Sequence, residues 1–114
     1  MDFSQSQPGQ MNIDIDNESG VYTIKLGGFV DTASSPFLQK KVEDIASSTY
    51  EKGGFNIVFD LDAVEFVSSA GLRVFLLARK IADKQKGNIT LINVRESIRD
   101  VLKMTGFAKI LNIK

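Results

Sequence analysis

The feature that most constrains the fold is a short apolar run, Phe55–Phe59 (FNIVF), that lies between two stretches of helical periodicity. An apolar run this short and this continuous is typical of a strand in the interior of a sheet. Residues 38–46 before it and residues 74–82 after it repeat their apolar side chains at the spacing of an amphipathic helix. Strands separated by helices pair in parallel through right-handed crossovers, so the pattern predicts an α/β fold.

A hairpin is predicted before the first helix. Residues 11–15 alternate apolar and polar side chains, and residues 16–20 turn the chain. Residues 21–26 form the second strand, which Gly27–Gly28 is expected to end.

Serine, proline and glycine mark the limits of the first helix. The helix starts within Asp31–Pro36, with Ser34 or Ser35 as its N-cap and Pro36 in its first turn. The glycine pair Gly53–Gly54 is expected to end it.

The second half of the chain repeats this alternation. Residues 60–65 (DLDAVE) are expected to connect the central strand to a second helix. That helix begins at Ser68 or Ser69 and runs to about residue 85. A further strand over residues 89–92 follows it.

A third helix is predicted from the capping-box spacing of Asn93 and Glu96. Its apolar stripe consists of Val94, Ile98, Val101 and Leu102. Gly106 is placed to end the helix, and residues 107–113 close the chain as a helix turn or a strand.

These elements give an α/β fold of order β-β-α-β-α-β-α, with a possible terminal β. We expect one small mixed sheet of four or five strands with helices packed against it. The chain has 114 residues, which is enough for one domain with a hydrophobic core and too few for two. Residues 11–114 form this domain, and residues 1–10, which lack periodicity, are interpreted as a flexible tail.

The chain contains no cysteine and no histidine. Disulfide scaffolds, cysteine-ligated zinc, thiol nucleophiles and Ser-His-Asp triads are therefore excluded. No apolar run approaches the roughly 20 residues that span a bilayer, and the N-terminus lacks a signal-peptide pattern. We expect a cytoplasmic protein that is not an enzyme, with no catalytic residues, no cofactor, no metal and no membrane segment.

Two groups of residues could still carry chemistry. Asp60, Asp62 and Glu65 could bind Mg²⁺, but aspartate commonly initiates turns, so we interpret these acids as turn residues. Ser68 or Ser69 would need a base to act as a nucleophile, and the sequence places none beside them. The chain also lacks a glycine-rich phosphate loop.

The net charge of zero hides an asymmetry. Residues 1–65 carry 11 acids and 4 bases, whereas residues 66–114 carry 10 bases and 3 acids. We expect the two halves to interleave so that the charges mix on the surface, with a basic face for an acidic partner as the alternative. Direct nucleic-acid binding would require more bases with interleaved aromatics, so it is not expected.

Ser69 is the most informative polar residue because it lies where the second helix starts. Its side chain is expected to serve as the N-cap, and a phosphate on its hydroxyl would lie at the positive end of the helix dipole. The helical wheel places Leu72 and Leu76 outside the buried arc and Arg73 four residues after Ser69. These side chains are either a small docking patch or a surface covered by a neighbouring helix.

At these residues the chain resembles STAS domains, and among them the bacterial anti-sigma factor antagonists. That family has a strand ending in Asp-Leu, then an aromatic residue, and then an Asp-Ser-Ser/Thr/Ala-Gly-Leu/Val motif that opens a helix. The matching residues here are Phe59, Asp60, Leu61, Phe66, Ser69, Gly71 and Leu72, with Gly28–Asp31 upstream and Val101–Phe107 downstream.

The resemblance implies a phosphorylation switch at Ser69. An unmodified antagonist would bind an anti-sigma factor that is a serine kinase, release a sigma factor, and be restored by a protein serine phosphatase. Ser68 stands where the family has Asp, so Ser68 is the alternative acceptor, and a STAS scaffold or sensor module that is not phosphorylated is the alternative function. The residues expected to contact the partner are Asp31, Ser68, Ser69, Ala70, Gly71, Leu72, Arg73 and Leu76.

Overall fold

The computed structural model describes residues 11–50 and 54–114, so the tail predicted for residues 1–10 and residue Gly53 of the predicted helix break lie outside the described residues. The elements are β1 (Asn12–Glu18), β2 (Val21–Val30), α1 (Ser35–Thr49), β3 (Asn56–Val67), α2 (Ser69–Lys84), β4 (Asn88–Ile92), α3 (Glu96–Met104), the 3₁₀ turn η1 (Phe107–Lys109) and β5 (Asn112–Ile113). Within the described part of the chain, no helix is long and apolar enough to cross a membrane.

The strands form a single five-stranded sheet whose spatial order, β1-β2-β3-β4-β5, follows the chain. The β1–β2 hairpin is antiparallel, and every later pair is parallel, as strands joined by crossover helices require. The strand predicted from the apolar run is the central one. The predicted α/β class and the mixed sheet are therefore confirmed, with the terminal strand present.

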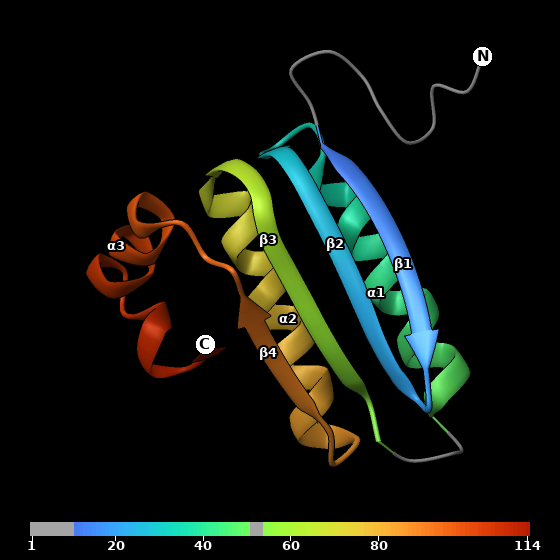
Figure 1. Cartoon of the computed structure of the whole chain (residues 1–114). Helices are drawn as coiled ribbons and strands as arrows, with labels where there is room; N and C mark the ends of the chain where they lie inside the picture. The colour runs from blue at the N-terminus through green and yellow to red at the C-terminus, as the bar shows by residue number, and fades with distance from the viewer. Residues whose placement is uncertain (1–10, 51–53) are drawn as a thin grey trace, which may run out of the picture.

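Helices α1 and α2 lie side by side on one face of the sheet (Figure 1). In β3 the alternate residues Ile57, Phe59 and Leu61 are fully buried beneath them, whereas Val58 and Asp60 point to the other face and are half-buried. Phe59 meets Phe75 of α2 edge-to-face, with ring centroids 5.0 Å apart. α3 and η1 lie at the β4 side of the sheet (Figure 1).

Two strands run further than their sequence predicts. β2 continues through Gly27–Gly28 to Val30, and β3 continues through the expected connection at 60–65 to Val67. The pairing survives because the register shifts twice, between Lys25 and Gly27 and between Gly28 and Phe29. Such bulges absorb an extra residue without ending a strand, and the backbone of Gly28 has a positive φ of 76° there. As a result, β2 and β3 end together at one edge of the sheet.

The start of α3 differs from the predicted capping box. Arg95 is the N-cap residue, and no side chain caps it. Asn93 adopts a left-handed φ of 55°, and its side-chain amide donates to Asp60 Oδ1 at 3.0 Å. The Asn93 side chain therefore joins the residue after β4 to the interior of β3. Val101 of the predicted stripe is exposed, because the short helix buries only a narrow face. Gly106 does follow the helix in the left-handed conformation, as predicted.

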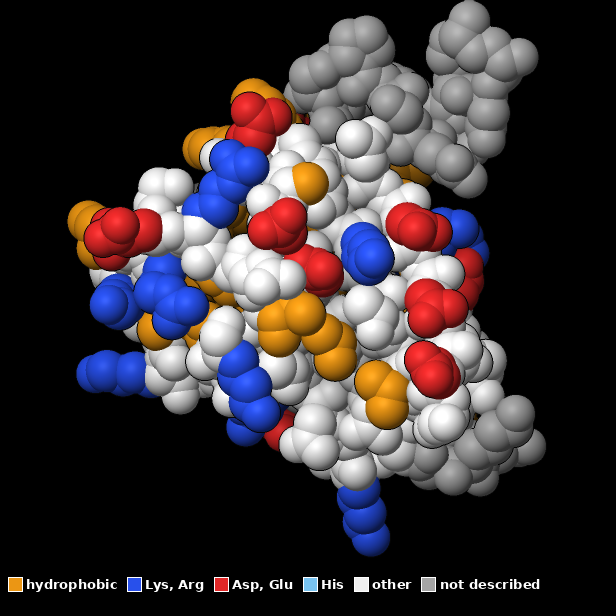
Figure 2. Space-filling view, in the orientation of Figure 1, with side chains coloured by type: hydrophobic (Ala, Val, Ile, Leu, Met, Phe, Trp, Pro, Cys, Tyr) orange, Lys and Arg blue, Asp and Glu red, His pale blue; other side chains and the backbone are white. Residues whose placement is uncertain are grey.

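The two charged halves of the chain do not interleave. Because the strand order follows the chain order, the acidic N-terminal half lies toward the β1 edge and the basic C-terminal half lies toward the β4–β5 edge. Figure 2 shows acidic side chains over the β1 side and also over the middle of the sheet, and most of the visible basic ones over the α3 side. The expectation of mixed charges is therefore wrong, and the molecule is electrostatically polarised across the sheet.

Candidate functional site: the start of α2

The site is the edge of the sheet at which β2 and β3 end and α2 begins. Ser68 follows β3 directly, and its N–H donates to the carbonyl of Val30 at the end of β2, at 2.9 Å. Ser68 has an extended backbone and is the N-cap of α2, because its Oγ accepts a long bond of 3.4 Å from the N–H of Gly71.

Ser69 is the first residue of the helix, and its side chain is exposed. The expectation that Ser69 itself caps the helix is therefore wrong by one residue. A residue inside the first turn points its side chain outward, whereas the preceding residue points its side chain back at the free N–H groups. The two serines consequently have different tasks: Ser68 holds the helix start, and the hydroxyl of Ser69 faces solvent.

This division of tasks predicts different stabilities for two matched variants. Ser68→Ala should lower the free energy of unfolding by about 1 kcal/mol, because it removes the cap. Ser69→Ala should change it by less than about 0.5 kcal/mol, because alanine is a good helix former at an exposed position. Urea unfolding of both variants measures the difference. A larger loss for Ser69→Ala would contradict the cap assignment.

Gly71 and Leu72 belong to the interior and not to the exposed surface. A Cβ on Gly71 would lie 2.6 Å from the Val30 carbonyl oxygen and 2.9 Å from a Val30 methyl group. The missing side chain thus lets α2 approach β2 closely. Leu72 is only 5% exposed, so the wheel's placement of it outside the buried arc is wrong, and of the two alternatives stated for it the covered surface holds and the docking patch does not. The buried arc of α2 is wider than the helical wheel suggested, because α2 packs against α1 as well as against the sheet.

The loop after β2 is held by Asp31. The Asp31 carboxylate accepts from the backbone N–H groups of Ala33 at 3.1 Å and Ser34 at 3.0 Å. Ser34 occupies the N-cap position of α1, as one of the two predicted alternatives, but its hydroxyl donates to the Phe29 carbonyl at 2.7 Å and does not cap the helix. Asp31 is half-buried and fixed next to Val30, which places its loop beside Ser68.

The structure thus brings most of the predicted contact residues to one edge. Ser69 and Arg73 are exposed, while Ser68, Ala70, Leu76 and Asp31 are half-buried. The backbone bond from Ser68 to Val30 joins the α2 residues to the Asp31 loop.

Two aromatic side chains at this edge matched the family pattern, but sequence reasoning did not place them among the partner contacts. Phe29 is 36% exposed and Phe66 is 48% exposed. They are paired across β2 and β3, with ring centroids 6.0 Å apart. Each immediately precedes a buried valine that ends its strand, so strand alternation could have placed both rings on the outer face.

The acids near the site serve local structure. Asp60 Oδ1 accepts from the N–H of Asp62 at 3.1 Å as well as from Asn93. Both acids lie in β3, so their interpretation as turn residues is corrected. Within residues 11–50 and 54–114, no group of three acids is close enough to hold a metal ion.

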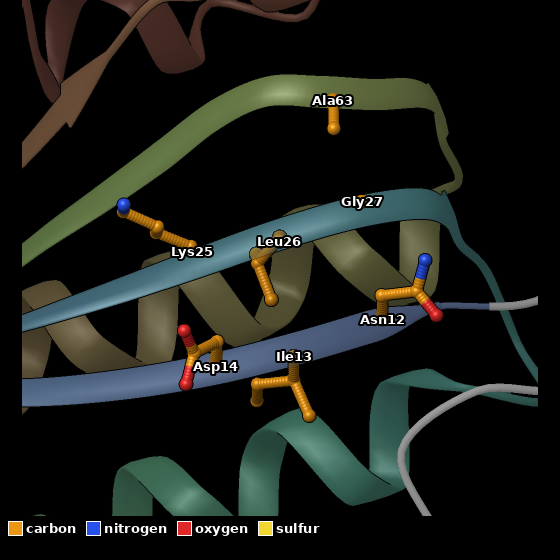
Figure 3. A pocket seen from close by; sticks show the side chains of 7 residues that line it. All are labelled: Asn12, Ile13, Asp14, Lys25, Leu26, Gly27 and Ala63. Carbon is orange, nitrogen blue, oxygen red and sulfur yellow. The ribbon is translucent and has the colours of Figure 1, made fainter.

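A hollow lined by residues of β1, β2 and β3 does not resemble a small-molecule site. It has a volume of about 340 Å³ and is lined by Asn12, Ile13, Asp14, Lys25, Leu26, Gly27 and Ala63. The Lys25 ammonium extends toward β3, whereas the Asp14 carboxylate stays over β1 (Figure 3). The polar groups do not converge on a common point, and ligand pockets require such convergence.

Comparison with known proteins identifies the family. The sequence model of the STAS domain matches residues 12–114. The chain belongs to the STAS domain family. BtrV of Bordetella bronchiseptica, named as a candidate anti-sigma factor antagonist, is 29% identical over 103 residues, which cover 90% of this chain and 85% of BtrV. The anti-sigma-B factor antagonist of Bacillus subtilis is 27% identical, with 90% of both chains covered.

Solved STAS structures agree with the fold. An anti-sigma factor antagonist from Mycobacterium paratuberculosis superposes with a TM-score of 0.79 at 22% identity, covering 95% of this chain and 88% of that one. SpoIIAA of Bacillus in its phosphorylated form gives a TM-score of 0.69 at 16% identity, covering 90% of both chains. The unphosphorylated form gives 0.70. The predicted STAS resemblance is confirmed.

Proposed function

We propose that this STAS domain is an anti-sigma factor antagonist that is switched by phosphorylation at Ser69. Without phosphate it binds an anti-sigma factor through the start of α2 and the adjoining β2–α1 loop, which frees a sigma factor. The anti-sigma factor is itself a serine kinase that modifies Ser69, and a protein serine phosphatase reverses the modification. The domain carries no catalytic role of its own in this scheme.

The observation that carries the proposal is the exposed hydroxyl of Ser69 at the first position of α2. A kinase needs an accessible hydroxyl, and a partner that covers this edge must also cover that hydroxyl. The names of the relatives support the class of partner, since they are antagonists of anti-sigma factors. SpoIIAA, which has the same fold, exists in a phosphorylated form.

Desolvation explains why phosphate would switch binding off. A phosphate adds about −1.5 to −2 charges at neutral pH. Water must leave the centre of a protein interface, so a partner without a prepared cation would bury that charge unpaired. A penalty of a few kcal/mol weakens binding roughly a hundredfold. The fold need not change, which agrees with the similar TM-scores to both forms of SpoIIAA.

Phosphate mapping tests the acceptor. The purified chain is incubated with ATP and, in turn, each serine-kinase anti-sigma factor of the source organism, and the product is analysed by mass spectrometry. We expect one phosphate on Ser69, which Ser69→Ala abolishes and Ser68→Ala retains. A phosphate on Ser68 would refute the assignment, because it would place the switch on the capping residue.

A second candidate function is a STAS scaffold or sensor module that is never phosphorylated. The observation that favours it is Ser68, which stands where the resembling family has an aspartate. The same experiment separates the two functions. A chain that binds an anti-sigma factor but accepts no phosphate from any of the kinases would support the scaffold.

A further inference from the structure

The aromatic pair, Phe29 and Phe66, is an apolar patch at the same edge as Ser69. Single exposed apolar side chains are common on protein surfaces and need no explanation. Here two phenylalanine rings from neighbouring strands contact each other and remain 36% and 48% exposed. Figure 2 shows hydrophobic side chains at the surface where β2 and β3 end. Leaving both rings partly in water forgoes burial free energy that the fold could otherwise gain.

The second bulge in the β2–β3 pairing creates this aromatic pair. Gly28 is paired with Val64, so an unbroken register would place Glu65 opposite Phe29. The shift between Gly28 and Phe29 skips one residue of β3 and places Phe66 opposite Phe29 instead. Bulges often re-aim a side chain next to a functional site. The local backbone is therefore arranged so that the two rings meet on the outer face.

The Phe29–Phe66 pair is continuous with the surface proposed to bind the anti-sigma factor, which consists of the start of α2 and the β2–α1 loop. The next residues along each strand, Val30 and Val67, are also paired, and the Ser68 N–H donates to the Val30 carbonyl. Ser69 is thus three residues from Phe66 along the chain, and the neighbouring Ser68 is bonded to the end of β2. One partner that covers the start of α2 can reach the rings without a break in the surface.

The charges around the pair favour a basic partner. The two segments that surround it, residues 26–35 and 60–72, contain four acids and no lysine or arginine. Glu65, which directly precedes Phe66, and Asp62, four residues before it, are both exposed on β3. The guanidinium of Arg95 approaches this region, since its Nε donates to the Asp62 carbonyl at 3.3 Å. Arg73, which directly follows the second segment, is also exposed at the start of α2. The four acids outnumber these two bases, so the rim is negative overall.

We propose that the Phe29–Phe66 pair is the apolar centre of the surface that binds the anti-sigma factor. This inference rests on the function proposed above and adds the chemistry of the contact. The partner presents an apolar side chain to the two rings, and it surrounds that side chain with basic residues that face Asp62 and Glu65. Aromatic side chains in the desolvated centre of an interface carry most of its binding free energy, and charges on the rim set orientation and rate.

The test measures binding to a purified anti-sigma factor, chosen because it binds the unmodified chain. Phe29→Ala and Phe66→Ala should each raise Kd at least about tenfold. The control is Tyr50→Ala, because Tyr50 is 74% exposed at the other end of the molecule, after α1. Tyr50→Ala should change Kd by less than about twofold, because residues away from the centre of an interface contribute little to binding. Thermal unfolding of each variant checks that the fold is kept.

A fluorescence variant provides a second measurement that does not depend on weakened binding. The chain contains no tryptophan, so Phe66→Trp adds a single reporter to it. Its emission, after subtraction of the partner's own spectrum, should shift to shorter wavelength in the complex. The emission of Tyr50→Trp should stay unchanged.

The outcomes separate this inference from the function on which it rests. If the unmodified chain and both alanine variants bind equally while Ser69→Asp does not bind, the aromatic centre is refuted and the switch survives. A Phe66→Trp chain that binds without an emission shift refutes the aromatic centre as well. If no anti-sigma factor binds the unmodified chain, both proposals are wrong.

Discussion

Gly87→Ala should lower the free energy of unfolding by about 3 kcal/mol or more, a large part of the stability of a small domain. A Cβ on Gly87 would lie 2.0 Å from the carbonyl oxygen of Phe55 and 2.6 Å from its backbone nitrogen. Phe55 is fully buried, and its carbonyl accepts from the N–H of Asn88 where β3 and β4 begin to pair. The backbone at residue 55 must move, so the core and the pairing are disturbed together.

Gly20→Ala is the matched control for this loss. Gly20 has a left-handed φ of 84°, but nothing lies within 4 Å of its added Cβ. Gly20→Ala should lower the free energy of unfolding by about 1 kcal/mol, which reflects backbone conformation alone. Urea unfolding of the two variants compares a steric clash with backbone strain. Equal losses for Gly87→Ala and Gly20→Ala would show that residues 55 and 87 are not in such close contact.

Ser69→Asp should weaken binding to the anti-sigma factor roughly a hundredfold, while Ser69→Ala should bind like the unchanged chain. The aspartate places a negative charge at the exposed first position of α2, inside the proposed contact surface. Removing the hydroxyl instead leaves a small neutral side chain that the partner can cover. Isothermal titration with the purified anti-sigma factor measures both constants.

Ser97→Asp controls for charge at a helix start. Ser97 is also exposed and lies in the first turn of α3, on the β4 side of the sheet. An acid there interacts with a helix dipole in the same way but lies outside the proposed contact surface. The affinity of Ser97→Asp for the anti-sigma factor should stay within about twofold of that of the unchanged chain. If Ser97→Asp and Ser69→Asp weaken binding equally, net charge and not position explains the loss.

The architecture could be predicted because its signals are local. The apolar run at Phe55–Phe59 between two helical stripes identified the central strand, and its flanking helices required parallel neighbours. The apolar positions of α2 were likewise readable, since the apolar repeat over residues 74–82 includes Val74, Phe75 and Ala78, which are buried. These features depend on residues within one or two turns of each other.

The errors came from features that depend on distant neighbours. Asp60, Asp62 and Glu65 resemble turn residues, but bulges let β3 keep its pairing with β2 through them. Leu72 is buried because α1 widens the covered face of α2. Gly87 follows the end of α2, and the sequence could not show that it also leaves room for the backbone of Phe55, 32 positions earlier in the chain.

The candidate site was predictable in position and not in detail. The resemblance located Ser69, and strand ends that meet at one edge brought Asp31 beside it. The exact start of α2 decided which of the two adjacent serines has which role. Ser68 caps the helix, and Ser69 faces solvent. The aromatic pair depends on a bulge that only the pairing of β2 with β3 reveals. Such details set which side chains a partner meets.

The central claim is that a phosphate on Ser69 alone decides whether the partner binds. The direct measurement titrates one purified anti-sigma factor with the same chain in two forms, unmodified and fully phosphorylated on Ser69. We predict tight binding of the unmodified form and an affinity at least roughly a hundredfold lower for the phosphorylated form. Equal affinities of the two forms would contradict it.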